Sequence, residues 1–248
     1  MLLNPKYAHL RDWLERLPEE FSRLGEVIYD KRNQLRVVTA PDGTVVNIKR
    51  YRTPRQPNRL VYSLGIRQPK GLRAFRYPSR LLERGIDTPE PIAYIEQLHW
   101  GMLGECYFVS VQSPLCHTLY EAGNAAEGTY EALADALGRF TAAMHESEVL
   151  HLDYSPGNIL WDTDEQGRYR FAVVDINRMR FGKVNMEDGC QALCRLWGPK
   201  RFIELVARSY AAARGYDTAR AVELTMQARV KFWTRYRRRH PVEFDLEL

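Results

Sequence analysis

The feature that most restricts what this chain can fold into is the segment His151–Asn158, which places a carboxylate and an amide side chain five positions apart. Asp153 and Asn158 have the spacing of phosphoryl-transfer loops, where the Asp handles the acceptor hydroxyl and the Asn holds magnesium. Asp175 follows at the end of an apolar run, where a carboxylate needs a cation or hydrogen-bond donors nearby. Oxygen ligands from neighbouring loops are the usual way in which proteins hold magnesium. The alternative is that Asp153 and Asn158 only form a hydrogen-bonded turn before a hairpin.

The first half of the chain has the apolar and turn patterns of short strands. The expected elements are, in order, a helical segment at 4–24 interrupted at Pro18, strands at 26–29, 35–39 and 44–51, a helix from about Leu72 to Gly85, and strands at 91–96 and 106–111. Residues 53–70 hold three prolines and are expected to form an irregular connection. The first three strands follow one another closely, which indicates an antiparallel meander.

The second half is mainly helical by composition. The expected elements are a helix at 130–145 with Thr129 as its N-cap, a hairpin of 159–161 with 169–174, and helices over 186–239 with breaks near Gly198 and Gly215. A strand-rich half followed by a helical half predicts an α+β fold of two lobes. We expect an N-terminal lobe at residues 1–111 and a C-terminal lobe at 112–248.

Composition agrees with an ordinary soluble protein and excludes several classes. The chain of 248 residues fits one large domain or two lobes. No apolar run approaches the roughly 18 residues of a membrane span, and the N-terminal residues lack the apolar region of a signal peptide, so we expect a cytoplasmic protein. The four cysteines are too few and scattered for a disulfide framework, and the pair Cys190 and Cys194 lacks further metal ligands nearby. Nothing in the sequence indicates an oligomer.

Basic residues are concentrated in two parts of the sequence. No Asp or Glu lies between Gly43 and Leu82, and a second cluster occupies residues 235–240. The basic residues of the first stretch are Lys49, Arg50, Arg52, Arg55, Arg59, Arg67, Lys70, Arg73, Arg76 and Arg80. Such fields attract phosphates, nucleic acid or anionic membranes, and a solvated basic face without a dedicated partner is the simpler alternative. No recognition motif or pattern of stacking aromatic residues supports nucleic acid.

Lys49 is a candidate for binding nucleotide, whereas His151 is expected to be structural. Lys49 lies on a predicted strand where Val46 and Ile48 share one face and Lys49 points to the other, a position from which a lysine can pair with nucleotide phosphates. A lone strand lysine is usually only solvated. His151 is expected to be structural, with its imidazole hydrogen-bonded to the backbone of the loop.

The order of these motifs resembles the protein-kinase-like fold. It consists of Val46-x-Ile48-Lys49, then His151-x-Asp153 with Asn158, then a strand-borne Asp175. The strings His-Leu-Asp-Tyr-Ser-Pro-Gly-Asn-Ile-Leu and Val-Asp-Ile-Asn-Arg-Met-Arg-Phe resemble the bacterial lipopolysaccharide kinase family, as does the segment from Gly85 to Pro91. The resemblance covers about residues 20–200. It implies a kinase that phosphorylates an inner-core sugar, either 3-deoxy-octulosonic acid or heptose, with ATP and Mg²⁺.

The resemblance also implies roles for single residues. Asp153 would be the catalytic base or would orient the hydroxyl, Asn158 and Asp175 would hold magnesium, and Lys49 would bind the nucleotide phosphates. Residues 108–113 would form the hinge that meets the adenine.

The loop expected to cover the phosphates and the catalytic loop supply further candidates. Lys31 and Arg32 lie in the loop 30–34 and could contact phosphate. Ser155 occupies the place where many protein kinases carry a phosphate-facing lysine. Its hydroxyl can bond a phosphate or a substrate hydroxyl, but it brings no charge.

Three departures from the kinase pattern stand out. The loop 30–34 lacks the G-x-G-x-x-G pattern, and the Asp-Phe-Gly triplet is replaced by Asp175-Ile176-Asn177. The strand lysine of kinases normally pairs with a helix glutamate, but the only acid between Lys49 and Asp87 is Glu83, near the expected helix end. Either Glu83 reaches Lys49 through an unusual geometry, or Lys49 is held differently, or the enzyme is weakened.

The acceptor is expected to be small, because the region after Asp175 is short and has no Ala-Pro-Glu string. The two basic clusters suit a sugar or glycolipid acceptor that is presented at an anionic membrane. We therefore also expect peripheral binding of the protein at the inner face of the inner membrane. Two alternatives stay open. One is a kinase-fold enzyme for another small molecule or a protein, and the other is a degenerate pseudokinase that acts as a binding module.

Overall fold

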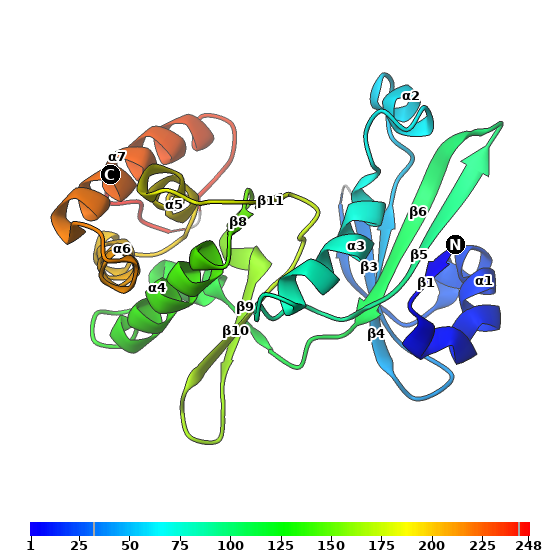
Figure 1. The fold of residues 1–248 in the computed structure, drawn as a ribbon, viewed down its shortest axis with the longest axis horizontal. Helices are drawn as coiled ribbons and strands as arrows, with labels where there is room; N and C mark the ends of the chain where they lie inside the picture. The colour runs from blue at the N-terminus through cyan, green and yellow to red at the C-terminus, as the bar shows by residue number, and fades with distance from the viewer. Residues whose placement is uncertain (32, 243) are drawn as a thin grey trace. The chain divides into compact units, whose positions relative to one another are not determined.

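The computed structural model describes residues 1–31, 33–242 and 244–248 (Figure 1). Contacts divide the chain into two units, which are described one at a time. The first unit comprises Met1–Glu83 and Thr88–Pro114, and the second comprises Arg84–Asp87 and Leu115–Leu248. Arg32, a candidate phosphate contact, lies outside the described residues.

The first unit is built on an antiparallel sheet with the strand order β1-β5-β6-β4-β3-β2. The strands are β1 (Leu2–Leu3), β2 (Glu26–Asp30), β3 (Asn33–Thr39), β4 (Val45–Tyr51), β5 (Pro91–His99) and β6 (Met102–Val111). The expected meander and strand pair are confirmed. Strands β5 and β6 run further than expected because Trp100 and Gly101 both adopt positive φ, which permits a two-residue hairpin turn.

Helices cover the two faces of this sheet. On one face lie η1 (Pro5–Leu10), α1 (Arg11–Glu20) and η2 (Phe21–Arg23), whose buried side chains share a core with Val46 and Ile48. On the other face, α3 (Lys70–Leu82) packs through Leu72 and Phe75 against a cluster that contains Tyr51. Alternation along β4 therefore places Lys49 on the α3 side of the sheet.

Two sequence predictions for the first unit were wrong. Pro18 lies inside α1 and does not interrupt it, because the apolar stripe of Trp13, Leu14 and Leu17 stays buried along the whole helix. The stretch expected to be irregular contains a short helix, α2 (Asn58–Ser63). No residue of α2 is buried, so it lacks the apolar periodicity by which a helix is recognised in sequence.

The second unit is mainly helical. Its helices are η3 (Leu119–Asn124), α4 (Glu131–Glu146), η4 (Pro156–Asn158), α5 (Met186–Leu193), α6 (Lys200–Arg214) and α7 (Thr218–Tyr236). A Cβ at Gly138 of α4 would come within 2.6 Å of the Val206 carbonyl oxygen, so α4 and α6 pack at close distance. The expected helix breaks near Gly198 and Gly215 are confirmed, whereas Thr129 is not the N-cap of α4: Tyr130 takes that position and Thr129 donates to Ala126.

Two small sheets complete the second unit. Strands β9 (Ile159–Thr163) and β10 (Tyr169–Val173) form the expected hairpin, and β7 (His117–Thr118) pairs with the other edge of β9. Strand β8 (Val149–His151) pairs with β11 (Met179–Phe181). The pairing of β8 with β11 sets the segment after Asp175 beside the segment that carries Asp153.

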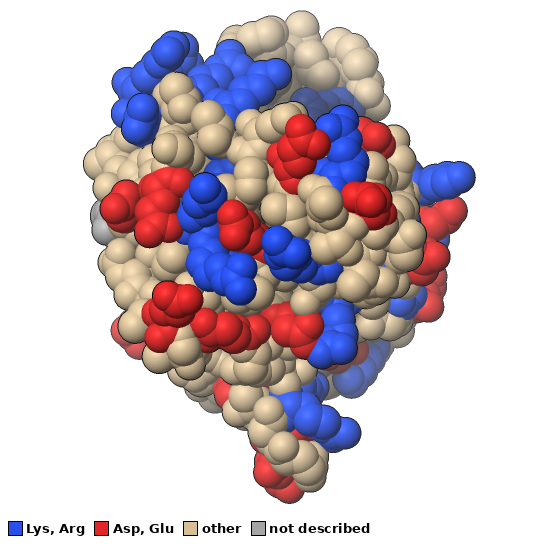
Figure 2. Space-filling view, turned by 90° about the vertical axis from the view of Figure 1, so that its left-hand side faces the viewer, with Lys and Arg blue, Asp and Glu red and all other residues tan. Residues whose placement is uncertain are grey.

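The helical surface of the second unit has mixed charge. Figure 2, viewed from the side on which α6 and α7 lie, shows basic and acidic side chains interspersed over most of that face. Helices α4, α6 and α7 carry ion pairs one turn apart, such as Arg201–Glu204 and Arg220–Glu223. This pattern is typical of a solvated surface. None of the helices formed by the described residues combines the length and apolar character that crossing a bilayer requires.

Candidate active site

The candidate catalytic loop lies between β8 and β9. His151 ends β8, Leu152–Ser155 form a turn, and Pro156–Asn158 form the single turn η4 before β9 begins. The Leu152 N–H donates to the Arg178 carbonyl at 2.9 Å, and the Val174 N–H donates to the Asn158 carbonyl at 3.0 Å. Backbone hydrogen bonds therefore join this loop to both sides of Asp175.

His151 joins the same two segments through its side chain. Its Nε2 lies 3.0 Å from the Val174 carbonyl oxygen, and its Nδ1 lies 3.1 Å from the Asp153 backbone N–H. Both hydrogen bonds form only in the neutral tautomer that carries the proton on Nε2. Burial lowers the pKa of His151, which favours that neutral form. The expected structural role of His151 is confirmed.

Tyr154 attaches the catalytic loop to the core of the second unit. Its side chain is fully buried and its hydroxyl lies 2.8 Å from Thr141 Oγ1, which also donates to the Leu137 carbonyl of α4. Burial raises the pKa of Tyr154, so the phenol stays protonated and can donate. The loop is therefore attached to helix α4.

Asp153 is held by two guanidinium groups. Arg195 Nη1 lies 3.0 Å from one carboxylate oxygen, and Arg178 Nη1 lies 3.4 Å from the other. All three side chains are partly exposed, so each pair contributes at most about 1 kcal/mol to stability, and the contacts act mainly on orientation. The Arg195 guanidinium also lies over the Phe232 ring of α7, at 5.0 Å from its centroid.

Asn158 has its side-chain amide fixed in one orientation. Its Nδ2 donates to the Asp153 carbonyl at 2.9 Å, and the Ser155 N–H donates to the same carbonyl. With the nitrogen committed, Oδ1 of Asn158 is the atom available to a cation. Ser155 is partly buried within this turn, which leaves its expected phosphate contact a proposal.

Asp175 has a backbone conformation that is uncommon for a residue with a side chain. Its φ is +52°, in the left-handed region, which costs roughly 1–3 kcal/mol and is found mainly at functional sites. The buried Asn177 donates its side-chain amide to the Asp175 carboxylate. In the Asp175-Ile176-Asn177 triplet, Ile176 is buried in the core and Asn177 orients the carboxylate.

The residues that could hold magnesium fit that ion. Asp175 offers carboxylate oxygens and Asn158 offers a carbonyl oxygen, the hard ligands that Mg²⁺ prefers. Hydrogen bonds within the second unit orient both groups, through Nδ2 of Asn158 and through Asn177. The structure thus brings Asp153, Asn158 and Asp175 together within the second unit.

The phosphate-binding candidates Lys49 and Lys31 lie in the first unit. Lys49 is in the middle of β4, opposite Leu35 and Phe108, and its ammonium lies 5.3 Å from the Tyr51 ring centroid. Lys31 is exposed in the turn between β2 and β3, where its N–H donates to the Asn33 carbonyl. Asp30 at the end of β2 accepts from Gln34 of β3, so a side-chain hydrogen bond also joins the two strands beside this turn.

Glu83 is not the acidic partner of Lys49. It is the exposed C-cap of α3, and within the described residues its carboxylate makes no hydrogen bond or ion pair. The α3 positions nearer the middle of the helix include Arg73, whose Nε and Nη2 are buried. Helix α3 (Lys70–Leu82) contains no glutamate, so it does not supply the acidic partner that the strand lysine has in kinases.

Two residues of the site escaped prediction from sequence. Arg178 lies in the string after Asp175 and could have been noticed from its place there, but no pattern connects Arg195 with Asp153. Their contact depends on the turn that follows α5 and on the packing of Phe232.

Comparison with known proteins identifies the relatives of this arrangement. The sequence model of the lipopolysaccharide kinase (Kdo/WaaP) family matches residues 25–197. No curated protein sequence matches the chain.

Solved structures with the same fold include three kinases. WaaP in complex with acyl carrier protein superposes with a TM-score of 0.57 and 17% identity, over 96% of this chain and 99% of that chain. The Rio2 kinase of Chaetomium thermophilum, in an ADP/Mg²⁺-phosphoaspartate complex, gives 0.51 and 15%, over 91% and 71%. Amicoumacin kinase hAmiN with AMP-PNP, Ca²⁺ and Ami gives 0.50 and 13%, over 97% and 82%. At these identities the likeness shows the fold, which is the protein-kinase-like α+β fold expected from the sequence.

Buried neutral histidines make stability depend on pH. Burial lowers the pKa of His145 to about 3 and also lowers that of His151, whereas both histidines titrate near about 6.5 in the unfolded chain. Below about pH 6.5 the unfolded state therefore binds protons that the folded state does not. We expect the free energy of unfolding to fall on acidification, by about 2 kcal/mol for His145 between about pH 7 and pH 5.

Urea unfolding of the wild type and of His145→Gln across this range measures the effect. The variant should show a flatter pH dependence, and His240→Gln, at an exposed site, is the control. An unchanged slope in His145→Gln would contradict the assignment.

Proposed function

Because the chain belongs to the lipopolysaccharide kinase (Kdo/WaaP) family, we propose that it transfers a phosphoryl group from ATP to a sugar hydroxyl of the lipopolysaccharide inner core. The observation that carries this proposal is the linked arrangement of Asp153, Asn158 and Asp175 in the second unit. Asp153 orients the acceptor hydroxyl and accepts its proton. Lys49 binds nucleotide phosphates, with Lys31 and Arg32 as further contacts.

Asn158 and Asp175 are the residues that would hold magnesium. Asn158 supplies Oδ1, since its nitrogen is committed to the Asp153 carbonyl, and Asp175 supplies its carboxylate in the orientation that Asn177 sets. A magnesium ion bound there supplies positive charge that neutralises the phosphates. The complexes named for the Rio2 and amicoumacin kinases, with ADP/Mg²⁺ and with AMP-PNP, support the same cofactors for this chain.

The surroundings of Asp153 favour an acidic acceptor. Two positively charged guanidinium groups lie beside the Asp153 carboxylate, the group that meets the acceptor. A carboxylate or phosphate on the acceptor would offset this charge. Among the two inner-core sugars, 3-deoxy-octulosonic acid carries a carboxylate and is the acceptor that we favour.

Loss of Asp153 should stop the reaction and spare nucleotide binding. We expect Asp153→Asn to lower transfer of ³²P from ATP to core oligosaccharide by roughly a hundredfold or more. Binding of ATP should change little, because Asp153 contacts the acceptor. The control is Glu165→Gln, an exposed acid on the β9–β10 turn of the same unit.

Undiminished transfer by Asp153→Asn would refute its role. If the wild type transfers phosphate neither to core sugars nor to other small molecules, the alternative of a pseudokinase binding module is favoured.

We also propose that the acceptor is reached at an anionic membrane surface. In the first unit, exposed apolar side chains lie on and after α2, near the end of β5 and on the β5–β6 turn: Leu60, Leu64, Ile66, Leu98 and Trp100. Arg59 joins the two parts, since it donates to the carbonyls of Leu103 and His99. Trp100 lies in the β5–β6 turn, where its φ is positive, and its side chain is fully exposed.

This combination of apolar and basic side chains suits a lipid interface. Arg55, Arg59 and Arg67 flank the apolar residues in a stretch without acids, and tryptophan prefers the headgroup region of bilayers. A cytoplasmic enzyme with such a surface would bind the inner face of the inner membrane. WaaP was solved in complex with acyl carrier protein, so an acyl carrier protein is the alternative partner for this surface.

Co-sedimentation with vesicles tests the lipid surface. We expect the wild type to bind phosphatidylcholine vesicles only when they contain phosphatidylglycerol, more weakly at high salt, and Trp100→Ala to bind several-fold less. Val230→Ser, an exposed apolar change on α7, is the control. The proposal would be overturned if vesicle binding did not depend on anionic lipid. It would also be overturned if the wild type bound no vesicles and instead formed a complex with acyl carrier protein that Trp100→Ala weakens.

A further inference from the structure

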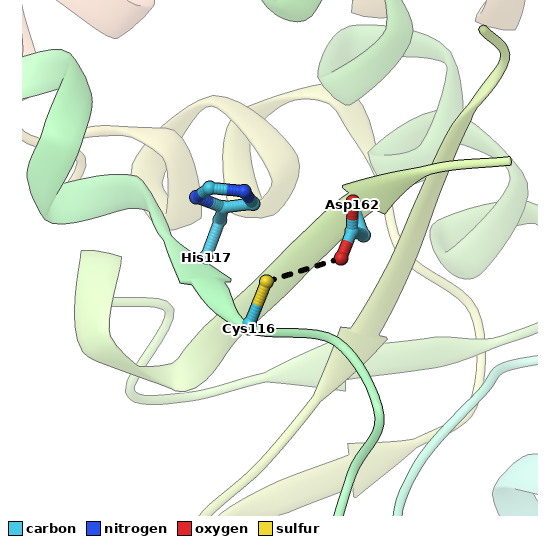
Figure 3. A group of neighbouring side chains, drawn as sticks. All are labelled: Cys116, His117 and Asp162. Atoms are coloured by element: carbon cyan, nitrogen blue, oxygen red, sulfur yellow. Dashed lines mark hydrogen bonds between the residues drawn. The ribbon is translucent and has the colours of Figure 1, made fainter.

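A second group of ligand atoms lies in the second unit, at the edge of the sheet β10-β9-β7. His117 and Thr118 of β7 pair with Trp161 and Leu160 of β9. This register brings Cys116, which precedes β7, beside Asp162 of β9. Figure 3 shows the Cys116 sulfur and the Asp162 carboxylate pointing toward one another, with the His117 ring beside them.

The three side chains are close enough to share one ion. One ligand atom from each of Cys116, His117 and Asp162 lies within 4.8 Å of the other two, and Cys116 Sγ is 3.2 Å from Asp162 Oδ2. In tetrahedral zinc sites, with bonds of about 2.0–2.3 Å, neighbouring ligand atoms are roughly 3.3–3.8 Å apart. The ligand atoms would therefore have to approach one another by at most roughly 1.5 Å to surround a zinc ion.

His117 has a carboxylate partner of the kind that orients ligating histidines. Its Nδ1 lies 3.0 and 3.1 Å from the two carboxylate oxygens of Glu121, and its ring stacks on Trp161 at 4.6 Å. A carboxylate that accepts from one ring nitrogen fixes the tautomer and leaves the other nitrogen with its lone pair, the usual arrangement around ligating histidines. The Glu121 side chain is itself held in place, because it accepts from the Thr118 backbone N–H in the capping box of η3.

The donor set selects the class of ion. Thiolate, imidazole and carboxylate together suit zinc and similar divalent transition metals, whereas magnesium prefers oxygen ligands alone. Cys116 now donates its proton to Asp162. Binding of the ion would release that proton to solvent and leave both groups as ligands.

We propose that Cys116, His117 and Asp162 form a zinc site, with Glu121 as the carboxylate that orients His117. The site ties the segment at Cys116, near the start of the main part of the second unit, to the β9–β10 hairpin. Three protein ligands leave a fourth position for water or a further ligand. The site is separate from the oxygen ligands Asn158 and Asp175 and does not depend on the proposed kinase activity.

Metal titration of the full chain tests the site. Protein treated with chelator and then dialysed is titrated with Zn²⁺ against a chromophoric indicator, and with Co²⁺ to detect the thiolate-to-cobalt absorption band. We expect one ion per chain and the band in the wild type. Cys116→Ser and Asp162→Asn should weaken zinc binding at least tenfold, and Cys116→Ser should abolish the band.

Two further variants separate a built site from chance binding. Glu121→Gln keeps all three ligands and should weaken zinc binding about 10–100-fold, as is usual for loss of an orienting carboxylate. Glu165→Gln and His240→Gln, exposed and outside the cluster, should bind zinc as the wild type does. Circular dichroism verifies that each variant is folded. Absence of zinc binding by the wild type, or equal binding by Cys116→Ser, would overturn the proposal.

Discussion

The candidate active site depends on the two hydrogen bonds of the buried His151 imidazole. One goes to the carbonyl of Val174 and the other comes from the N–H of Asp153, so a single side chain sets the catalytic loop against the end of β10. The pairing of β8 with β11 and the contact of Tyr154 with Thr141 support the same loop from two other sides. The side chains of His151, Tyr154 and Thr141 are buried, and within the second unit they join the segments that carry Asp153 and Asp175.

One departure from the kinase pattern, the Asp175-Ile176-Asn177 triplet, has a local replacement. Asn177 takes the place of a glycine and holds the Asp175 carboxylate by a hydrogen bond, which offsets part of the cost of the positive φ. Arg178 and Arg195 hold Asp153. Glu83 does not replace the helix glutamate, because it is the exposed C-cap of α3. Retention of the oxygen ligands in the second unit favours an enzyme over a pseudokinase.

Much of the fold could be predicted because it is encoded locally. Several features are determined by residues that are close together in the sequence. They are the loop 151–158, the hairpin that ends before Asp175 and the helix breaks near residues 198 and 215. Strands β7, β8 and β11 have two or three residues each, too few to show a periodicity.

Contacts between distant segments could not be predicted. Arg195 meets Asp153 across 42 positions and Asp162 meets Cys116 across 46, and both contacts follow from packing that no sequence spacing reveals.

Binding of magnesium nucleotide tests the central claim most directly. In a thermal-shift titration, ATP with Mg²⁺ should raise the Tm of the wild type more than ATP with chelator does. Asp175→Asn should lose most of this magnesium-dependent shift, and since asparagine tolerates a positive φ, the variant should fold. A magnesium-dependent shift of equal size in the variant, or none in the wild type, would contradict the account.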